Sequence, residues 1–452
     1  MLVYAVASVG GNRGVQWLGT VPSHWEVLRL KHKCEVFPSN VDKQTREDEP
    51  SIRLCNYTDV YYNERITPDL GFMEATASPD QIARFTLKAG DTIITKDSET
   101  ADDIAIAAYV PQDLPGIVCG YHLSLVRPRL TTSGAFVKRA FDSLYAKARF
   151  AVAANGLTRV GLSQYALDNV ELPFPPFEEQ EAIAAFLDRE TAKIDALIAE
   201  QEKLIALLAE KRKAAISHAV TKGLAPKTPM KDSGVAWLGH IPAHWEMKRI
   251  KDCGCEVVDC KNRTPELHDD GDYFVVRTSC VKDGRFDPEP GYRTNEANFI
   301  EWTAKGKPQA GDVLFTREAP TGEACLAPEG LDFCLGQRMM YIRPPKHVLL
   351  SEFLLFSIYG GLARERISEK SKGSTVGHLR VGEVGELPLL LPPLEEQRAL
   401  VDFVGTELSR LESLAAEAER AITLMKERRG ALITAAVTGQ VDVRNEIAGV
   451  LP

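Results

Sequence analysis

Cysteine and histidine, the residues that most often carry out chemistry, form no catalytic or metal-binding pattern in this chain. Its nine cysteines are odd in number and scattered, which is typical of a reducing compartment and not of a disulfide framework. Four of them stand at Cys253, Cys255, Cys260 and Cys280, but the paired C-x-x-C spacing of a zinc site is missing. We therefore expect buried free thiols and no bound metal.

Motifs for cofactors and catalysis are missing as well. The chain has no G-x-x-x-x-G-K-[ST] phosphate loop for ATP and no G-x-G-x-x-G turn after a strand. It also lacks the N/D-P-P-Y/F motif typical of amino-methyltransferases and any carboxylate cluster with nuclease spacing. The sequence therefore predicts a protein without a catalytic centre or a cofactor of its own.

A long helix is the element that must position any functional side chain. The run P-P-F-E-E-Q at 175–180 starts it, because two prolines can precede a helix but not lie inside it. No glycine or proline follows until Gly223, so the helix Glu178–Thr221 would be ~66 Å long at ~1.5 Å per residue. Its apolar residues recur three and four positions apart, as one stripe: Leu187, Ile194, Leu197, Ile198, Leu204, Ile205 and Leu208.

A second helix of the same kind lies in the other half of the chain. P-P-L-E-E-Q at 392–397 repeats the helix start, and A-V-T-G at 436–439 repeats the A-V-T-K-G ending at 219–223. The second stripe consists of Val404, Leu408, Leu411, Ala415, Ala418, Ile422, Met425 and Leu432. Because a long helix with one apolar stripe needs a partner helix, we predict an intramolecular coiled coil.

The duplication extends to the globular parts of the chain. W-L-G at 17–19 and H-W-E at 24–26 recur at 237–239 and 244–246. Gly90-Asp91 recurs as Gly311-Asp312, and Arg127-Pro128 as Arg343-Pro344, whereas Ser51–Asn63 and Asp272–Phe286 have little in common. Since residues that read two different targets should differ, the identically placed Trp17, Trp25, Trp237 and Trp245, with His24 and His244, are predicted to be core anchors.

The predicted fold class is α+β, with two globular domains of similar fold, a coiled coil of two long helices and an internal pseudo-twofold repeat. Each domain has many short β-prone runs flanked by turn residues, and one helix each is expected at Ala135–Ala151 and Glu352–Ser368. The predicted segments are an extension (1–13), domain 1 (14–176), helix 1 (177–223), a linker (224–233), domain 2 (234–392), helix 2 (393–439) and a tail (440–452).

Charge and hydropathy narrow the class of protein. The net charge of −9 argues against a uniformly basic surface, but it does not exclude nucleic acid, since binding depends on where basic residues lie. The basic runs Lys138, Arg139, Lys147, Arg149 and Arg364, Arg366, Lys370, Lys372 are expected to be solvated faces. No stretch approaches the length of a membrane span, and Met1–Gly11 is interpreted as a loose extension and not a signal peptide.

These motifs resemble the specificity subunit of type I restriction-modification systems over nearly the whole chain. The resemblance rests on the doubled W-L-G-x-[VI]-P-x-H-W-E opening, the doubled P-P-[FL]-E-E-Q helix start and the run A-V-T-G-Q-V-D-V-R at 436–444. It implies two target-recognition domains separated by two antiparallel helices, each domain reading half of a bipartite, asymmetric site on double-stranded DNA. The helices would set the spacing.

The resemblance also implies partners. Two methyltransferase (modification) subunits would dock on the helices, and restriction-translocase subunits would join through them. S-adenosylmethionine, ATP and Mg would then be bound by those partner subunits, in the cytoplasm of a bacterium or archaeon.

Base reading requires hydrogen-bonding side chains on the elements that differ between the halves. We expect them in the loops after the matched Gly-Asp strands and in the loops before the two helix starts. The candidates in domain 1 are Lys96, Asp97, Ser98, Thr100, Asn155, Thr158, Arg159, Ser163 and Gln164, and those in domain 2 are Arg317, Glu318, Thr321, Lys372, Ser374, Thr375, His378 and Arg380.

Two other interpretations remain open from the sequence. The chain could be a coiled-coil scaffold that holds two protein-binding domains without nucleic acid, which a salt-insensitive interaction with proteins alone would favour. It could also serve a complex that only methylates.

Overall fold

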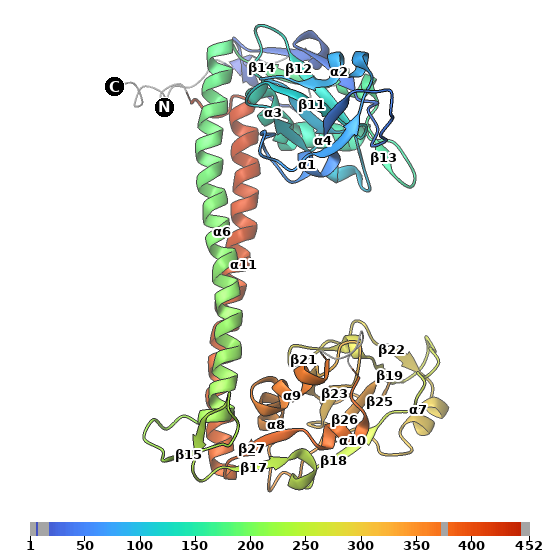
Figure 1. The fold of residues 1–452 in the computed structure, drawn as a ribbon, viewed down its shortest axis with the longest axis vertical. Coiled ribbons are helices and arrows are strands. Elements are labelled where there is room, and N and C mark those ends of the chain that lie inside the picture. Colours follow the sequence, from blue (N-terminus) through green and yellow to red (C-terminus); the bar gives the residue numbers. More distant parts are fainter. Residues whose placement is uncertain (1–5, 8–17, 372–377, 444–452) are drawn as a thin grey trace. The chain divides into compact units, whose positions relative to one another are not determined.

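The computed structural model describes residues 6–7, 18–371 and 378–443, and the chain divides into two compact units. Unit 1 comprises residues 1–201 and 420–452, and unit 2 comprises residues 202–419. Each unit contains one globular domain and a part of each long helix (Figure 1). Apart from strand β1 (Val6–Ala7), which pairs with β2 (Val21–Pro22), the predicted extension 1–13 lies outside the described residues.

Domain 1 is built on two four-stranded sheets. The first has the order β10-β8-β12-β4, all antiparallel, with the bounds Ala107–Tyr109, Thr92–Thr95, Leu123–Pro128 and Cys34–Pro38. The second has the order β6-β5-β11-β7, with the bounds Met73–Thr76, Ser51–Cys55, Leu114–Cys119 and Thr86–Leu87. Alternate residues of β8 point to opposite faces, so Ile93 packs in the core of the second sheet and Ile94 in the core that includes the long helices.

Short helices and strands cover these sheets. They are β3 (Glu26–Arg29), α1 (Tyr57–Tyr61), α2 (Pro79–Phe85), β9 (Asp97–Ser98), α3 (Gly134–Asp142), α4 (Leu144–Ala153), β13 (Val160–Gly161), α5 (Gln164–Asp168) and β14 (Glu171–Phe174). The single helix predicted at Ala135–Ala151 is wrong, because Ser143 is extended between α3 and α4. Its hydroxyl accepts a hydrogen bond from the Ala146 amide and caps α4.

Domain 2 repeats this topology. Its antiparallel sheet has the order β18-β26-β23-β24, with the bounds Glu256–Asp259, Met339–Arg343, Val313–Thr316 and Ala324–Leu326. Its second sheet has the order β22-β19-β25, with the bounds Tyr292–Thr294, Tyr273–Val276 and Phe333–Leu335. β19 pairs with β25 in parallel, as β5 does with β11. The stretches that diverge most in sequence therefore begin in equivalent strands.

The remaining elements of domain 2 are also short. They are β15 (Met230–Asp232), β16 (His240–Pro242), β17 (Glu246–Arg249), β20 (Val281–Lys282), β21 (Arg285–Phe286), α7 (Glu296–Trp302), α8 (Ser351–Tyr359), α9 (Leu362–Ser371), α10 (Val381–Gly385) and β27 (Pro388–Leu391). The helix predicted at Glu352–Ser368 is again two helices, which Gly360 and Gly361 separate. A Cβ at Gly360 would lie 2.7 Å from Cγ2 of Ile216, so this break packs directly on α6. The predicted linker 224–233 contains β15, which pairs with β16.

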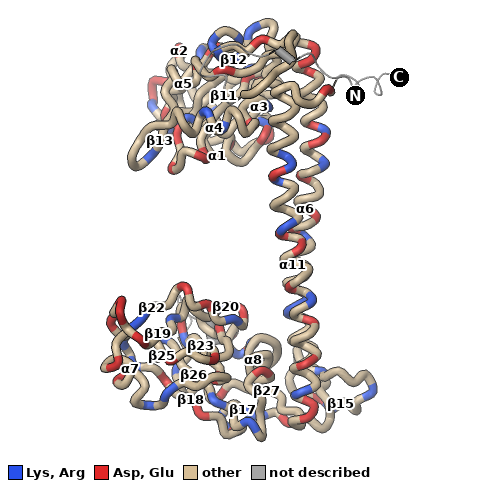
Figure 2. Tube along the Cα trace, turned by 180° about the vertical axis from the view of Figure 1, so that it is seen from behind, with Lys and Arg blue, Asp and Glu red and all other residues tan. Residues whose placement is uncertain are grey.

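The two long helices are α6 (Phe177–Lys222) and α11 (Leu394–Val437), of 46 and 44 residues. In unit 1 the beginning of α6 lies beside the end of α11, and in unit 2 the end of α6 lies beside the beginning of α11, so the pairing is antiparallel in each (Figure 1). Basic and acidic residues alternate along both helices (Figure 2).

Most of the predicted stripe is buried. Leu187, Ile194, Ile198, Leu208, Val404 and Leu411 are at most 9% exposed, and Ile205, Leu408, Ile422 and Met425 are partly buried. Leu197 and Leu204 are 55% and 40% exposed, so their assignment to the stripe was wrong. Each directly precedes a buried or partly buried isoleucine and points about 100° away from it.

Within each half of the chain, the H-W-E motif contacts the helix-start motif. Nε2 of His24 lies 2.9 Å from Oε2 of Glu179, and Nε2 of His244 lies 2.7 Å from Oε2 of Glu396. The H-W-E segment of each domain is thus tied to the first turn of that domain's long helix. Trp25 and Trp245 are buried, as predicted, whereas Trp237 is 53% exposed and is not a core anchor. His24 and His244 are also exposed, so their prediction as core anchors was wrong. Trp17 lies outside the described residues.

The glutamine that ends each helix-start motif is a second tie. Gln180 is buried, accepts a hydrogen bond from the Ser133 amide and donates one to the Pro175 carbonyl. Gln397 does the same with the Leu350 amide and the Pro392 carbonyl. Each long helix therefore begins in fixed contact with the N-terminus of α3 or α8.

The matched Gly-Asp and Arg-Pro pairs form an ion pair in each domain. Arg127 donates from Nε and Nη2 to the two carboxylate oxygens of Asp91, at 2.8 and 2.7 Å. Arg343 and Asp312 repeat this contact with the same two distances. Asp91 directly precedes β8, and Arg127 lies in β12. The ion pair therefore links the two central strands of the sheet.

Candidate nucleic-acid interface

The two sets of loops predicted to carry the functional residues meet in each domain. In domain 1, β9 after the Gly-Asp strand pairs with β13, and the Leu162 amide donates to the Lys96 carbonyl at 2.8 Å. In domain 2 the Leu379 amide donates to the Arg317 carbonyl at 3.1 Å. The repeat therefore places both loop pairs by the same backbone contact.

A third segment, which the sequence analysis missed, joins them. The Lys96 amide donates to the His122 carbonyl at 3.1 Å, and the Arg317 amide donates to the Arg338 carbonyl at 2.9 Å. His122 and Arg338 lie in the turns before β12 and β26. We call the convergence of these segments the loop edge, which consists of residues 96–100, 121–122 and 155–164 in domain 1, and of 317–321, 337–338 and 378–380 in domain 2.

A carboxylate contacts a histidine and an arginine at the loop edge of domain 1. Asp97 lies 2.8 Å from Nδ1 of His122 and 3.5 Å from Nη2 of Arg159. The Arg159 side chain is 54% exposed, so its guanidinium can still reach a ligand. Such a guanidinium can donate to a phosphate or to the two acceptors of a guanine edge.

The loop edge of domain 2 has the same arrangement with the residue types exchanged. Glu318 lies 3.5 Å from Nε of Arg338 and 3.6 Å from Nδ1 of His378. Here the arginine comes from the turn and the histidine from the loop before the helix start, the reverse of domain 1. The two domains therefore share the same backbone contacts at the loop edge, but they present different hydrogen-bonding side chains to a ligand.

The predicted residues of domain 1 divide into exposed and buried ones. The exposed ones are Thr100, Asn155, Thr158, Arg159, Ser163 and Gln164. Ser98 is only 3% exposed, and Lys96 is half-buried, with Nζ donating to the Ser39 carbonyl at 3.0 Å. Burial lowers the pKa of Lys96. Ser163 also caps α5 by accepting from the Ala166 amide.

In domain 2 fewer of the predicted residues remain accessible. Arg317 is 8% exposed and lies 3.5 Å from Asp259, so it is part of the domain interior. The Thr321 hydroxyl donates to the Arg317 carbonyl at 3.1 Å. His378 and Arg380 are exposed, and Lys372, Ser374 and Thr375 lie outside the described residues. Contact of the exposed residues with DNA stays a prediction.

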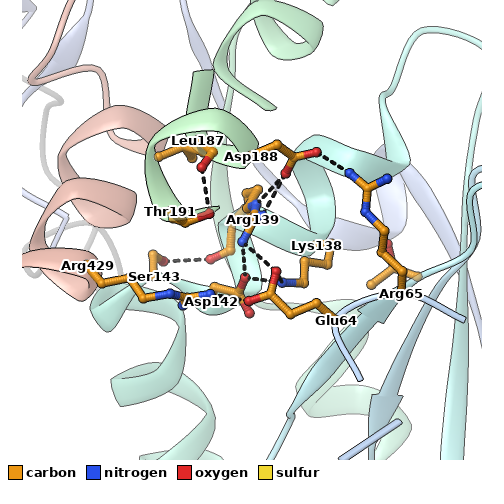
Figure 3. A network of polar contacts seen from close by, with 12 residues as sticks. Glu64, Arg65, Lys138, Arg139, Asp142, Ser143, Leu187, Asp188, Thr191 and Arg429 are labelled. Atoms are coloured by element: carbon orange, nitrogen blue, oxygen red, sulfur yellow. Dashed lines mark hydrogen bonds and ion pairs between the residues drawn. The ribbon is translucent and has the colours of Figure 1, made fainter. Parts of the chain in front are cut away.

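An ionic network joins domain 1 to the long helices (Figure 3). Lys138 and Arg139 of α3, predicted to be solvated, are 4% and 5% exposed. Both lie 3.2 Å from Oε2 of Glu64, and Arg429 of α11 pairs with the same carboxylate. Asp188 of α6 accepts from Arg139 at 2.6 Å. These basic residues therefore hold the domain on its helices and do not form a surface for a ligand.

The helix of domain 2 that is equivalent to α3 carries an apolar residue and a tyrosine in place of this ionic network. Leu355 and Tyr359 of α8 occupy the places of Lys138 and Asp142, and Leu355 is buried. The Tyr359 hydroxyl accepts from the amides of Gly284 and Ala324 at 2.9 and 3.0 Å. Burial raises the pKa of this phenol, so it stays neutral.

The network predicts that unit 1 is sensitive to acid. Burial of Glu64 opposes its ionisation, but Lys138, Arg139 and Arg429 outweigh this and lower its pKa to about 2. A lowered pKa stabilises the fold above the ordinary value near 4.5 and ceases to do so as the pH falls towards 2. Because the carboxyl is 45% exposed, solvent screening reduces the expected loss to about 1 kcal/mol.

Thermal unfolding of the full chain between pH 6 and pH 2 would measure this effect. Glu64→Gln should lower the midpoint of unit 1 at pH 6 and should approach the wild type at the acidic end. A constant difference between the two proteins at every pH would contradict the role assigned to Glu64.

The cysteines and the possible metal ligands of the described residues form no further site. All nine cysteines are free, and eight are buried. Burial raises the pKa of the Cys253, Cys260 and Cys280 thiols, and that of Cys255 to about 12. Among residues 6–7, 18–371 and 378–443, no group of three or more His, Cys, Asp or Glu is placed to hold a metal ion. None of the described helices has the length and apolar character needed to cross a membrane.

Comparison with known proteins gives the class of this chain. Residues 22–206 and 242–419 match the type I restriction modification DNA specificity domain. The chain therefore belongs to that family and is a specificity subunit, the non-catalytic DNA-recognition component, with two target-recognition domains.

Individual specificity subunits are similar in sequence or fold over most of the chain. A type I restriction enzyme specificity subunit of Methanocaldococcus jannaschii is 22% identical over 438 residues, which cover 94% of this chain and 96% of the relative. The EcoKI specificity subunit of Escherichia coli K12 is 24% identical over 415 residues, covering 87% and 82%. Among solved structures, the HsdS subunit from Thermoanaerobacter tengcongensis has a TM-score of 0.53 at 18% identity, covering 93% of this chain and 98% of its own, which shows a common fold.

Proposed function

We propose that each loop edge reads one half of a bipartite, asymmetric DNA site. This proposal rests on the two loop edges, which share their backbone contacts and a carboxylate that contacts an arginine and a histidine, but which differ in the side chains they present. A reader of two unlike half-sites requires this combination of equal positioning and different hydrogen-bonding groups.

The long helices are proposed to set the distance between the half-sites and to dock two methyltransferase subunits. Exposed apolar side chains of both helices support the docking, because exposed apolar surface often marks a protein interaction site. Phe403, Leu197, Leu207 and Leu424 are 46%, 55%, 52% and 64% exposed. Restriction-translocase subunits would join through the methyltransferase core.

Catalysis and cofactors are proposed to belong to those partners. S-adenosylmethionine would be bound by the methyltransferase subunits, and ATP with Mg by the translocase subunits. The assembled complex would act on DNA in the cytoplasm of a bacterium or archaeon. A methylation-only complex would use the same chain without the translocase subunits.

Domain exchange tests whether the two edges read independently. Residues 14–176 are replaced by the equivalent domain of a relative, and the chimera is expressed with its methyltransferase subunits in a host without other DNA methylation. Methylome sequencing should show one new half-site and one unchanged half-site. The reciprocal control replaces residues 234–392 and should change the other half only. A change of both halves in either chimera would contradict independent reading.

A further inference from the structure

The turns that precede β12 and β26 make the same backbone hydrogen bonds, although Arg338 in domain 2 has a positive φ and the equivalent His122 in domain 1 does not. The Gly120 amide donates to the Cys55 carbonyl at 2.9 Å, and the Leu123 amide closes the turn on the Gly120 carbonyl at 3.1 Å. In domain 2 the Gly336 amide donates to the Val276 carbonyl at 2.8 Å, and the Met339 amide closes the turn on Gly336 at 3.3 Å. Each turn is therefore fixed at its first and last residues.

The first residue of each turn must be small. A Cβ at Gly120 would lie 2.7 Å from the Cys55 carbonyl oxygen, and one at Gly336 would lie 3.1 Å from the Val276 carbonyl oxygen. The close approach to β5 thus requires glycine at position 120, and the approach to β19 favours glycine at position 336. The two central residues of each turn differ between the domains: Tyr121-His122 in domain 1 and Gln337-Arg338 in domain 2.

Arg338 adopts a left-handed backbone conformation, which glycine would adopt more easily than arginine. Its φ is +75°, in the left-handed region where a side chain is strained and glycine is favoured. The side chain is 46% exposed, with Glu318 3.5 Å away. Strain of this kind is a feature of functional sites, since glycine would form the same turn more easily.

Tyr121 occupies the preceding position in the turn of domain 1. Its side chain is 52% exposed, and Nζ of Lys96 lies 4.6 Å from the centre of its ring. His122 beside it is held by Asp97. The central pair of each turn therefore reaches solvent among the cations and hydrogen-bonding groups of the loop edge.

We propose that these central pairs are specificity-determining residues, and that Arg338 reads a guanine of the half-site recognised by domain 2. An arginine donates two hydrogen bonds to O6 and N7 of guanine in the major groove, a pattern that no other base offers. Gln337 next to it has the amide that pairs in the same manner with adenine. This inference rests on the proposed function, in which each loop edge reads one half-site.

The test uses the full chain assembled with its methyltransferase subunits. Arg338→Gly removes the side chain and suits the positive φ, and Arg338→Asn is a second variant that also tolerates this backbone. Lys346→Ala is the matched control, because Lys346 is an exposed cation in the loop after the opposite end of β26. Binding is measured on duplexes that carry each single base-pair change in the two half-sites, and methylomes are compared.

For Arg338→Gly and Arg338→Asn, discrimination at one G·C pair of the domain 2 half-site should fall roughly 5- to 150-fold. The other half-site should stay unchanged, and Lys346→Ala should keep the full wild-type motif. An equal loss of affinity on every duplex, or unaltered discrimination in both folded variants, would overturn the inference. If the wild-type complex itself methylated no bipartite site, the proposed function would fail instead.

Discussion

Insertion of four residues between Glu200 and Gln201 should lengthen the non-specific spacer of the methylated site by one base pair, or by two, with both half-sites unchanged. The helix α6 is uninterrupted there, so no loop can absorb the insertion. Four residues add ~6 Å and rotate the helix by about 40° beyond a full turn. One base pair adds ~3.4 Å of rise and about 35° of twist. The rotation matches one pair, and the added length lies between one and two.

Pairing of the helices should survive this change. Four residues nearly preserve the spacing of the apolar stripe, as a stutter does in a coiled coil. Three inserted residues are the control, since they shift the stripe by about 60° in the opposite direction and should abolish methylation. The measurement is methylome sequencing with the partner subunits present. Full activity of the four-residue variant on the original spacing would show that the helix does not set the distance.

Asp91→Ala should destabilise unit 1 by about 3 kcal/mol, because removal of one partner leaves a partly buried charge without compensation. The Asp91 side chain is 1% exposed and that of Arg127 is 22% exposed. Asp91 also accepts a hydrogen bond from the Lys88 amide at 2.8 Å. In the variant this amide loses its acceptor. Arg127 keeps its charge in the variant, because the guanidinium of an arginine is not deprotonated in proteins.

Calorimetry of the full chain would locate this effect. Asp312→Ala removes the equivalent carboxylate of domain 2 and should lower the transition of unit 2 only. Asp91→Asn keeps the shape and some of the hydrogen bonds and should cost less than Asp91→Ala. If Asp91→Ala unfolded like the wild type, the ion pair that links β8 and β12 would not contribute to stability.

The long helices and the duplication are predictable because their signals are local. Two prolines, an acidic first turn and a stripe of three-four spacing define α6 without reference to any other segment. The break at Ser143 is also local in cause, but a serine inside a helical pattern resembles an ordinary surface residue until its hydroxyl caps α4. Leu197 shows the remaining limit, since one position decides whether a leucine meets the partner helix or water.

The loop edge is less predictable because it is made by tertiary contacts. The Gly-Asp loops were found through their repeat, but the turns at 120–123 and 336–339 carry only a glycine in common. Their importance appears when β5 and β11 pair in parallel and bring Gly120 against Cys55. Lys138 and Arg139 mislead in the opposite way, because Glu64 and Asp188, which neutralise them, are distant in sequence.

The division of unit 1 into two separate stretches of sequence has a consequence for synthesis. Ile433 and Val437 of α11 share a core with Trp25 and Leu187, and a Cβ at Gly439 would lie 2.3 Å from Cδ of Pro22. This core stays open while the ribosome makes residues 202–419, for roughly 10 to 45 s at 5–20 residues per second. Unit 2 is one continuous stretch and can fold first. The domain translated first is therefore the one completed last, and its apolar core stays exposed in the interval.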